Sequence, residues 1–226
     1  MKLSEKTKLR NRAILIIELL RKNTQHMTKP AASTIVEKYG KNPFLILVSC
    51  LLSLRTKDTI SLPASLELFA YAQKPQQLLA LSDKKLESII YSTGFYRQKA
   101  AQLKHVSKEL IERFDSKVPC TQEELLSLKG VGRKTANLVL GQAFDIPAIC
   151  VDVHVHRISN RLGLVETKTP YETESALQEI LPKKYWIEFN TLLVVWGQNI
   201  CVPVSPLCSK CVLFDVCPKI GVKKHR

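Results

Sequence analysis

The run LKGVGRKTA, residues 128–136, constrains the fold of this 226-residue chain more than any other feature. Two glycines bracket a single valine there, and a chain that turns so sharply can require a positive φ. The preceding TQEE, residues 121–124, has the pattern of a capping box, which starts a helix. Apolar side chains recur at helical spacing in residues 133–144. The pattern predicts a helix-hairpin-helix over residues 121–144.

A hairpin of this kind presents backbone N–H groups at a helix N-terminus, which is a ready site for an anion such as a phosphodiester. Two cations follow it directly. The competing interpretation is an ordinary helix turn, because Gly-x-Gly alone is a weak signal. The capping box, the hairpin and the cations together favour a phosphate clamp. Its candidate residues are Lys129, Gly130, Val131, Gly132 and Arg133.

Lys134 lies in the first turn of the second predicted helix, beside Arg133. The positive end of the helix dipole and the neighbouring cation both disfavour a charged ammonium group there. A free amine is the form in which lysine acts as a Schiff-base nucleophile. The alternative role is that of a solvated lysine that adds to phosphate binding, and the lysine taken alone favours this alternative.

The segment VDVHVHR, residues 151–157, predicts the start of another helix. Apolar residues at helical spacing place Asp152 at its N-cap, where a carboxylate commonly binds backbone N–H groups. A capping carboxylate can do a second job through its outer oxygen. His154 and His156 do not share a helix face, since they are two residues apart, so a paired metal site is not expected.

Four cysteines near the end of the chain have the spacing C-x6-C-x2-C-x5-C, and they are Cys201, Cys208, Cys211 and Cys217. Interleaved prolines indicate a loop. Such a group forms a metal site more often than disulfides in a reducing compartment. Zinc sites usually pair two C-x2-C knuckles, whereas this tail has one, which fits a [4Fe-4S] cluster better. The scattered Cys50, Cys120 and Cys150 are interpreted as plain thiols.

These motifs, together with LLSLRTKD (residues 51–58) and GFYRQKA (residues 94–100), resemble those of endonuclease III, within the helix-hairpin-helix DNA glycosylase superfamily. The match runs in order from about Asn42 to Cys217. The resemblance implies a base excision repair enzyme that removes oxidised pyrimidines from duplex DNA and nicks the strand at the abasic site by β-elimination. It also implies a monomer that binds damaged double-stranded DNA and no membrane.

The resemblance assigns roles to individual residues. Lys134 matches the family's nucleophile. Asp152 matches the aspartate that activates the amine or stabilises the positive charge on the sugar. Arg55 and Phe95 match side chains that push into the duplex where the damaged nucleotide has flipped out. The four tail cysteines match the ligands of a [4Fe-4S] cluster, which shapes a DNA-contacting loop. His154 matches a family position, for which we expect a structural or DNA-contact role.

Two positions depart from the family pattern, and two other functions compete with the bifunctional enzyme. Lys129 stands where the family commonly has proline, and Arg55 stands where several relatives have glutamine. A monofunctional mismatch glycosylase would share the hairpin, the aspartate and the cluster, but it typically lacks the lysine equivalent to Lys134. A non-catalytic DNA-binding paralogue is the third possibility, and Lys134 with Asp152 at matching places argues against it.

The expected fold is all-α, with two lobes and a C-terminal iron–sulfur loop at residues 201–217. A six-helix bundle of residues 36–146 is expected to carry the helix-hairpin-helix, and residues 1–35 and 147–226 to form the second lobe. The resemblance places the reaction between these lobes. Helical patterns occur at residues 9–22, 31–39, 43–52, 58–69, 75–81, 83–91, 98–114, 123–128, 133–144, 153–162, 171–181 and 184–198.

Charge and hydropathy agree with a nucleic-acid partner without proving one. The chain has 34 Lys and Arg against 20 Asp and Glu, for a net charge of +14, which attracts phosphate backbones. RNA or anionic membranes would attract it as well. The charged runs at both ends are expected to be solvated and frayed. With no secretory signal and no run of transmembrane length, the expected location is intracellular, and cytoplasmic with the nucleoid in a bacterium.

Overall fold

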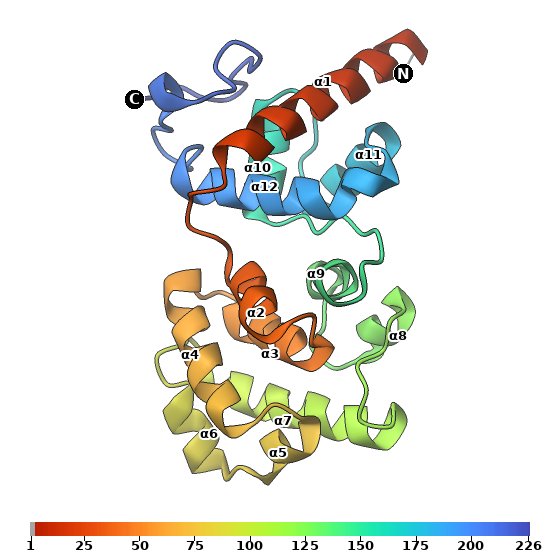
Figure 1. Cartoon of the computed structure of the whole chain (residues 1–226), viewed down its shortest axis with the longest axis vertical. Coiled ribbons are helices and arrows are strands. Elements are labelled where there is room, and N and C mark those ends of the chain that lie inside the picture. Colours follow the sequence, from red (N-terminus) through yellow and green to blue (C-terminus); the bar gives the residue numbers. More distant parts are fainter. Residues whose placement is uncertain (1–2) are drawn as a thin grey trace. The chain divides into compact units, whose positions relative to one another are not determined.

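The computed structural model describes residues 3–226, and in this part of the chain it contains α-helices and two short 3-10 helices but no strands (Figure 1). The all-α fold class is therefore confirmed. The α-helices are α1 Leu3–Asn23, α2 Ala31–Tyr39, α3 Pro43–Ser53, α4 Asp58–Tyr71, α5 Pro75–Ala80, α6 Asp83–Ile89, α7 Tyr96–Arg113, α8 Gln122–Ser127, α9 Arg133–Phe144, α10 Val153–Arg161, α11 Pro170–Ile180 and α12 Trp186–Asn199. None of them is long and apolar enough to span a bilayer.

The helices form two compact units. We call Pro30–Ile146 the hairpin unit, and the remainder, which is the chain up to Lys29 together with Pro147–Arg226, the terminal unit. The expected bundle of residues 36–146 lies within the hairpin unit. Residues 30–35 also belong to that unit, because α2 packs on α3 and Ile35 is fully buried.

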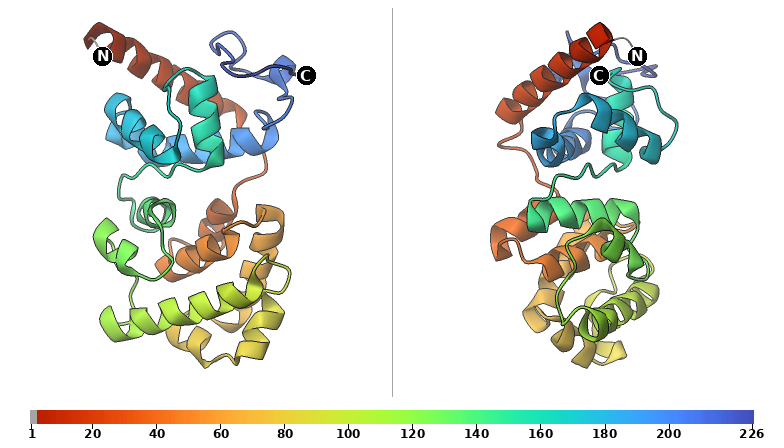
Figure 2. Two further views of the ribbon diagram at one scale, coloured as in Figure 1. Left: turned by 180° about the vertical axis from the view of Figure 1, so that it is seen from behind. Right: turned by 90° about the vertical axis from the view of Figure 1, so that its right-hand side faces the viewer.

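The hairpin unit is built around α3, which packs against α2, α4, α7 and α9. Every residue of α3 from Phe44 to Leu52 is buried, so the helix is apolar on all sides, as a central helix must be. Asn42 caps it by accepting hydrogen bonds from two backbone N–H groups, and Pro43 occupies its first turn. Beneath it, α7 lies along α5 and α6 (Figure 2).

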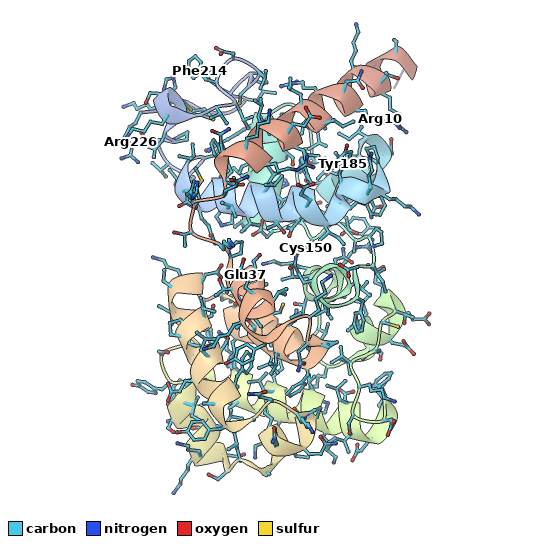
Figure 3. All side chains as sticks on the ribbon, in the orientation of Figure 1. Arg10, Glu37, Cys150, Tyr185, Phe214 and Arg226 are labelled. Atoms are coloured by element: carbon cyan, nitrogen blue, oxygen red, sulfur yellow. The ribbon has the colours of Figure 1, made fainter. Side chains whose placement is uncertain are left out.

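The terminal unit contains both ends of the chain (Figure 1). Its core joins α1, α10, α11 and α12, with the rings of Phe189 and Trp196 fully buried among aliphatic side chains. Tyr185, labelled in Figure 3, lies partly buried against this core. In α1, four residues at helical spacing are completely buried, Ala13, Ile16, Ile17 and Leu20. This apolar face holds the N-terminal helix in the fold.

The prediction of a frayed N-terminal run is wrong for the described residues, since α1 begins at Leu3 rather than at Leu9. Two of its cations bond to the rest of the terminal unit. Arg10 donates to the carbonyl of Ile180 at 3.4 Å, and Arg12 donates to the carbonyl of Val216 at 2.9 Å. These contacts anchor the charged segment. Lys2, which belongs to the same charged run, lies outside the described residues.

Candidate active site

The helix-hairpin-helix forms as predicted, with α8 and α9 joined at residues 128–132. The side-chain oxygen of Thr121 accepts a hydrogen bond from the N–H of Glu124 at 3.3 Å, which is the first half of a capping box. The second half differs from the pattern. The Glu124 carboxylate accepts from the Thr121 hydroxyl at 2.6 Å instead of reaching the backbone N–H of that residue.

The turn of the hairpin needs one of its two glycines for backbone reasons. Gly130 has a φ of 79°, in the left-handed region that favours glycine, whereas Gly132 has a φ of −92°, which any residue adopts. Helix α7 supports this turn from the side. Gln102 donates to the carbonyl of Gly130 at 3.0 Å, and Glu109 accepts from the N–H of Lys129 at 3.0 Å.

Two hairpin N–H groups are available to an anion. Gly130 and Gly132 are exposed, and neither N–H group donates to any atom of residues 3–226. Val131 differs from them, because its side chain is buried and its N–H donates to the carbonyl of Leu128 at 3.0 Å. The available donors lie at the N-terminus of α9, where the helix dipole also favours negative charge.

Lys134 is the second residue of α9, and its side chain is exposed. It lies close enough to Cys50 of α3 for its charge to lower the pKa of that thiol. Burial has the larger effect and raises the pKa of Cys50 to about 12. Cys50 therefore stays protonated near neutral pH and offers no competing nucleophile.

Asp152 is the N-cap of α10, as its spacing predicted. One carboxylate oxygen, Oδ1, accepts from the N–H groups of both His154 and Val155, each at 2.9 Å. No group of the described residues donates a hydrogen bond to the other oxygen, Oδ2. Oδ1 alone thus forms the cap of α10. Asp152 belongs to the terminal unit and Lys134 to the hairpin unit.

The start of α10 is held by contacts that no local motif indicated. Arg157 donates to the carbonyl of Cys201 at 2.8 Å and to His154 Nδ1 at 3.1 Å, and burial lowers the pKa of its guanidinium. His154 packs directly on Gly197 of α12, where an added Cβ would lie 2.8 Å from the Cβ of His154. These contacts place His154 in the packing between α10 and α12.

The four tail cysteines line one common pocket. All four are free thiols, as are Cys50, Cys120 and Cys150. Among the described residues, no three His, Cys, Asp or Glu side chains are grouped as a single metal ion requires. A zinc ion needs its sulfur ligands at about 2.3 Å. Four thiols around one pocket can instead hold a polynuclear cluster, with one thiolate on each iron.

The surroundings of the pocket also fit an anionic thiolate cluster. Two cations, Arg161 and Lys219, line it, and Arg161 donates to the sulfur of Cys201 at 3.4 Å. Burial raises the pKa of the Cys211 thiol, while the Trp196 side chain acts in the opposite direction. The indole N–H of Trp196 is buried and makes no hydrogen bond of normal geometry among the described residues, although it lies near enough to the Cys211 thiol to lower the pKa of that thiol. A thiolate on Cys211 would supply the negative charge that this donor lacks.

Arg55 and Phe95 stand side by side in the hairpin unit. The Arg55 guanidinium lies over the Phe95 ring, 5.8 Å from its centroid, and Phe95 is 56 % exposed. Both residues have positive φ, 54° for Arg55 and 60° for Phe95. Such backbone is strained for bulky residues and tends to occur at functional sites.

Residues 48–183 match the HhH-GPD superfamily of base excision DNA repair proteins. The chain is 45 % identical over 196 residues to endonuclease III of Thermotoga maritima, covering 84 % of this chain and 92 % of that protein. It is also similar to a structure described as a non-covalent endonuclease III–DNA complex, with a TM-score of 0.82 and 32 % identity over 93 % of this chain and 95 % of that one. A trapped endonuclease III–DNA covalent intermediate gives a TM-score of 0.76 at 32 % identity, covering 92 % and 96 %. The chain therefore belongs to the HhH-GPD superfamily and, within it, to the endonuclease III enzymes, which are DNA glycosylases with lyase activity at abasic sites.

Proposed function

We propose that this endonuclease III removes oxidised or ring-saturated pyrimidines from chromosomal DNA inside the cell and then nicks the strand, with Lys134 as the nucleophile for both steps. The observation that carries the proposal is the position of Lys134, an exposed lysine in the first turn of α9, directly after the unpaired N–H groups of Gly130 and Gly132. Phosphate-binding donors and an amine thus stand next to each other.

The hairpin binds the DNA backbone. The N–H groups of Gly130 and Gly132 donate to phosphate oxygens, and the side chains of Lys129 and Arg133 add positive charge nearby. The net charge of +14 strengthens this binding without regard to sequence. Because the donors are fixed by the hairpin, the bound phosphate sets the position of the neighbouring sugar relative to Lys134.

The excision step forms one bond and breaks another. The neutral amine of Lys134 attacks C1′ of the sugar, the N-glycosidic bond breaks, and its electron pair leaves with the base, which takes up a proton. Oδ2 of Asp152 accepts the proton that the amine must lose or stabilises the positive charge that develops on the sugar. The sugar opens to an imine on Lys134.

The nicking step follows from the imine. The imine acidifies the C2′ hydrogen, whose removal as a proton lets the C3′–O bond break, and the 3′ phosphate leaves with that bond's electron pair. Water then hydrolyses the imine, which releases the sugar fragment and restores the amine of Lys134. The covalent endonuclease III–DNA intermediate among the similar structures supports such a linkage.

Arg55 and Phe95 act on the duplex rather than on the bond that breaks. A nucleotide must leave the base stack before its sugar can reach an active-site lysine. Both side chains are exposed and lie against each other, so they can enter the space that the nucleotide vacates. Phe95 offers a flat apolar surface for stacking, and Arg55 offers donors to the orphaned partner base.

The four tail cysteines hold a [4Fe-4S] cluster, on the grounds of their common pocket, the two cations that line it and the family to which the chain belongs. The cluster fixes the shape of a loop that contacts DNA and takes no part in breaking bonds. Exposed cations follow the last ligand, Lys223, Lys224 and Arg226. Their charge lets the C-terminal segment bind the phosphate backbone.

A nicking assay tests the proposal. A duplex with one thymine glycol is incubated with the enzyme, and half of each sample is treated with hot alkali, which cuts every abasic site. The proposal predicts the same yield of nicks with and without alkali. Nicks that appear only after alkali would identify a monofunctional glycosylase. Binding without nicks in either half would identify a non-catalytic DNA-binding protein.

A further inference from the structure

Lys99 is a buried lysine with no role in the chemistry described above. The residue is 5 % exposed, and it lies in the first turn of α7. Its amine Nζ donates to the carbonyl of Leu52 and to the hydroxyl of Thr56, each at 2.7 Å. Burying a lysine is unfavourable unless its donors are satisfied, so these two bonds account for its inward orientation.

The two acceptors of Lys99 lie on either side of Arg55. Leu52 belongs to the last turn of α3, whose final carbonyl groups lack partners within the helix. The ammonium group satisfies one of these carbonyls and interacts favourably with the negative end of the helix dipole. Thr56 follows Arg55 directly. Lys99 therefore ties the two flanks of Arg55 to α7.

The same residue also holds Phe95. The backbone N–H of Lys99 donates to the carbonyl of Phe95 at 3.0 Å, at the N-terminus of α7. The two loops meet beside it, since a Cβ added to Gly94 would lie 3.8 Å from the carbonyl oxygen of Arg55. One residue thus bonds to both loops, through its backbone at Phe95 and through its side chain around Arg55.

The strain in these loops explains why such support is needed. Arg55 and Phe95 both have positive φ, and bulky residues keep this backbone only where the surrounding structure over-determines it. Burial lowers the pKa of Lys99 to about 8, so most molecules still carry the charge at neutral pH. Its bonds to Leu52 and Thr56 are then charge-assisted, which makes them stronger than neutral hydrogen bonds.

We propose that Lys99 is a positioning residue that holds Arg55 and Phe95 in the conformation that enters the DNA duplex. This inference rests on the proposed role of these two side chains in nucleotide extrusion. Lys99 touches neither the DNA nor the reacting atoms. Its contribution is made before DNA binds, because a preformed pair of inserting side chains loses less conformational entropy on binding.

Single-turnover excision of thymine glycol from a duplex tests this role. The variant is Lys99→Met, which keeps most of the length of the side chain and removes the N–H donors of Nζ. We expect excision about tenfold slower, the loss that follows from removing a charge-assisted hydrogen bond. Cutting of an abasic site in single-stranded DNA needs no extrusion and should change less than about twofold. Thr56→Val, which removes one acceptor and leaves Lys99 in place, should show a smaller loss of the same kind.

Lys104→Met is the matched control. Lys104 lies on the same helix and also donates to carbonyl groups, those of Leu79 and Leu81, away from both loops. It should leave duplex excision within about twofold of wild type. A second background carries both Arg55→Ala and Phe95→Ala. Adding Lys99→Met to it should slow duplex excision by less than about twofold, because the side chains that Lys99 positions are no longer present.

Two results would overturn the role of Lys99. One is a tenfold loss that persists in the Arg55→Ala, Phe95→Ala background or appears equally on single-stranded DNA. The other is unchanged duplex excision by folded Lys99→Met and Thr56→Val. If wild type excises nothing from the duplex, the proposed function itself fails and the positioning role fails with it. A thermal melt of each variant separates these results from unfolding.

Discussion

The guanidinium of Arg161 donates a hydrogen bond to the sulfur of Cys201, 3.4 Å away. Arg161 also donates to the carbonyl of Val202 at 2.8 Å, while its own carbonyl accepts from the N–H of Ile220 at 3.1 Å. The last residue of α10 therefore holds the cysteine loop at both ends. This arrangement would make the stability of the proposed cluster depend on a residue that is not one of its ligands.

Replacing Arg161 by methionine should make the cysteine loop more mobile without preventing folding of the helices. Loss of the hydrogen bonds from Arg161 to the loop should destabilise the folded loop by about 1–3 kcal/mol. Purified Arg161→Met should therefore lose iron and sulfide several-fold faster than wild type during dialysis against a chelator. Arg21→Met serves as the control, because Arg21 forms an exposed ion pair with Glu188 in the same unit. Equal iron loss in both variants would contradict the role of Arg161.

The two hairpin glycines should respond differently to alanine. Gly130→Ala puts a side chain at a φ of 79° and its Cβ within 2.3 Å of Gln102 Nε2, so it should lower the free energy of unfolding by about 1–2 kcal/mol. Gly132→Ala meets no atom within 4 Å and has an ordinary φ, so its stability should stay within about 0.5 kcal/mol of wild type. Denaturant unfolding of the two variants measures the difference, and similar stabilities would contradict this account of the turn.

Asp152 allows its structural and chemical roles to be separated. Asn caps helices about as well as Asp, so Asp152→Asn should melt near wild type, whereas Asp152→Ala should lose about 1 kcal/mol. Both variants remove the carboxylate and should therefore slow excision severely. Melting curves and single-turnover rates of the pair provide the comparison. A fully active Asp152→Asn would assign the residue to capping alone.

His154 and Gly197 provide a test of packing beneath the start of α10. A Cβ on residue 197 would lie 2.5 Å from Nδ1 and 2.8 Å from Cβ of His154, and the second of these atoms cannot move aside without the helix backbone. Gly197→Ala should therefore cost about 1–3 kcal/mol of stability. In a His154→Gly background, which removes both of these atoms, adding Gly197→Ala should cost little further stability. A loss that remains unchanged in the double variant would point to a different cause.

Lys99 should leave a signature in the pH dependence of stability. Burial lowers its pKa from 10.5 to about 8, so between these values the unfolded chain binds more protons than the folded chain. The free energy of unfolding then rises with pH in this interval. Wild type should gain stability relative to Lys99→Met from pH 8 to pH 10.5, and the difference should be constant below about pH 7. A difference that is flat over the whole range would contradict the lowered pKa.

Features with local causes could be predicted from the sequence. The hairpin, the start of α9 and the Asp152 cap depend on residues within a few positions of each other, and they form where the pattern indicated. The predicted helix ends also lie close to the observed ones, and α2 and α9 begin and end at the predicted residues. The beginning of α1 was missed because residues 3–8 show no apolar periodicity, and the bonds of Arg10 and Arg12 depend on distant partners.

Tertiary causes left no such signal. Lys99 resembles any solvated lysine of an amphipathic helix, and its inward orientation results from the end of α3, which lies 47 residues away in sequence. The sequence gives no reason for a glycine at position 197 inside α12. The reason is the close packing of His154 against it, which leaves no room for a Cβ. Arg157 and Arg161 are similar cases, since their acceptors lie about 40 residues further along the chain. Which polar side chains turn inward could not be predicted without the packing of the helices.

The central claim is that one lysine performs both steps, and borohydride trapping tests it most directly. Wild type and Lys134→Ala are each incubated with a thymine glycol duplex in the presence of borohydride, which reduces an imine to a stable amine. The account predicts a covalent protein–DNA adduct with wild type and none with Lys134→Ala, whose melting temperature and duplex affinity should stay near wild type. An adduct of equal yield with folded Lys134→Ala, or free base released by wild type with no adduct at all, would contradict it.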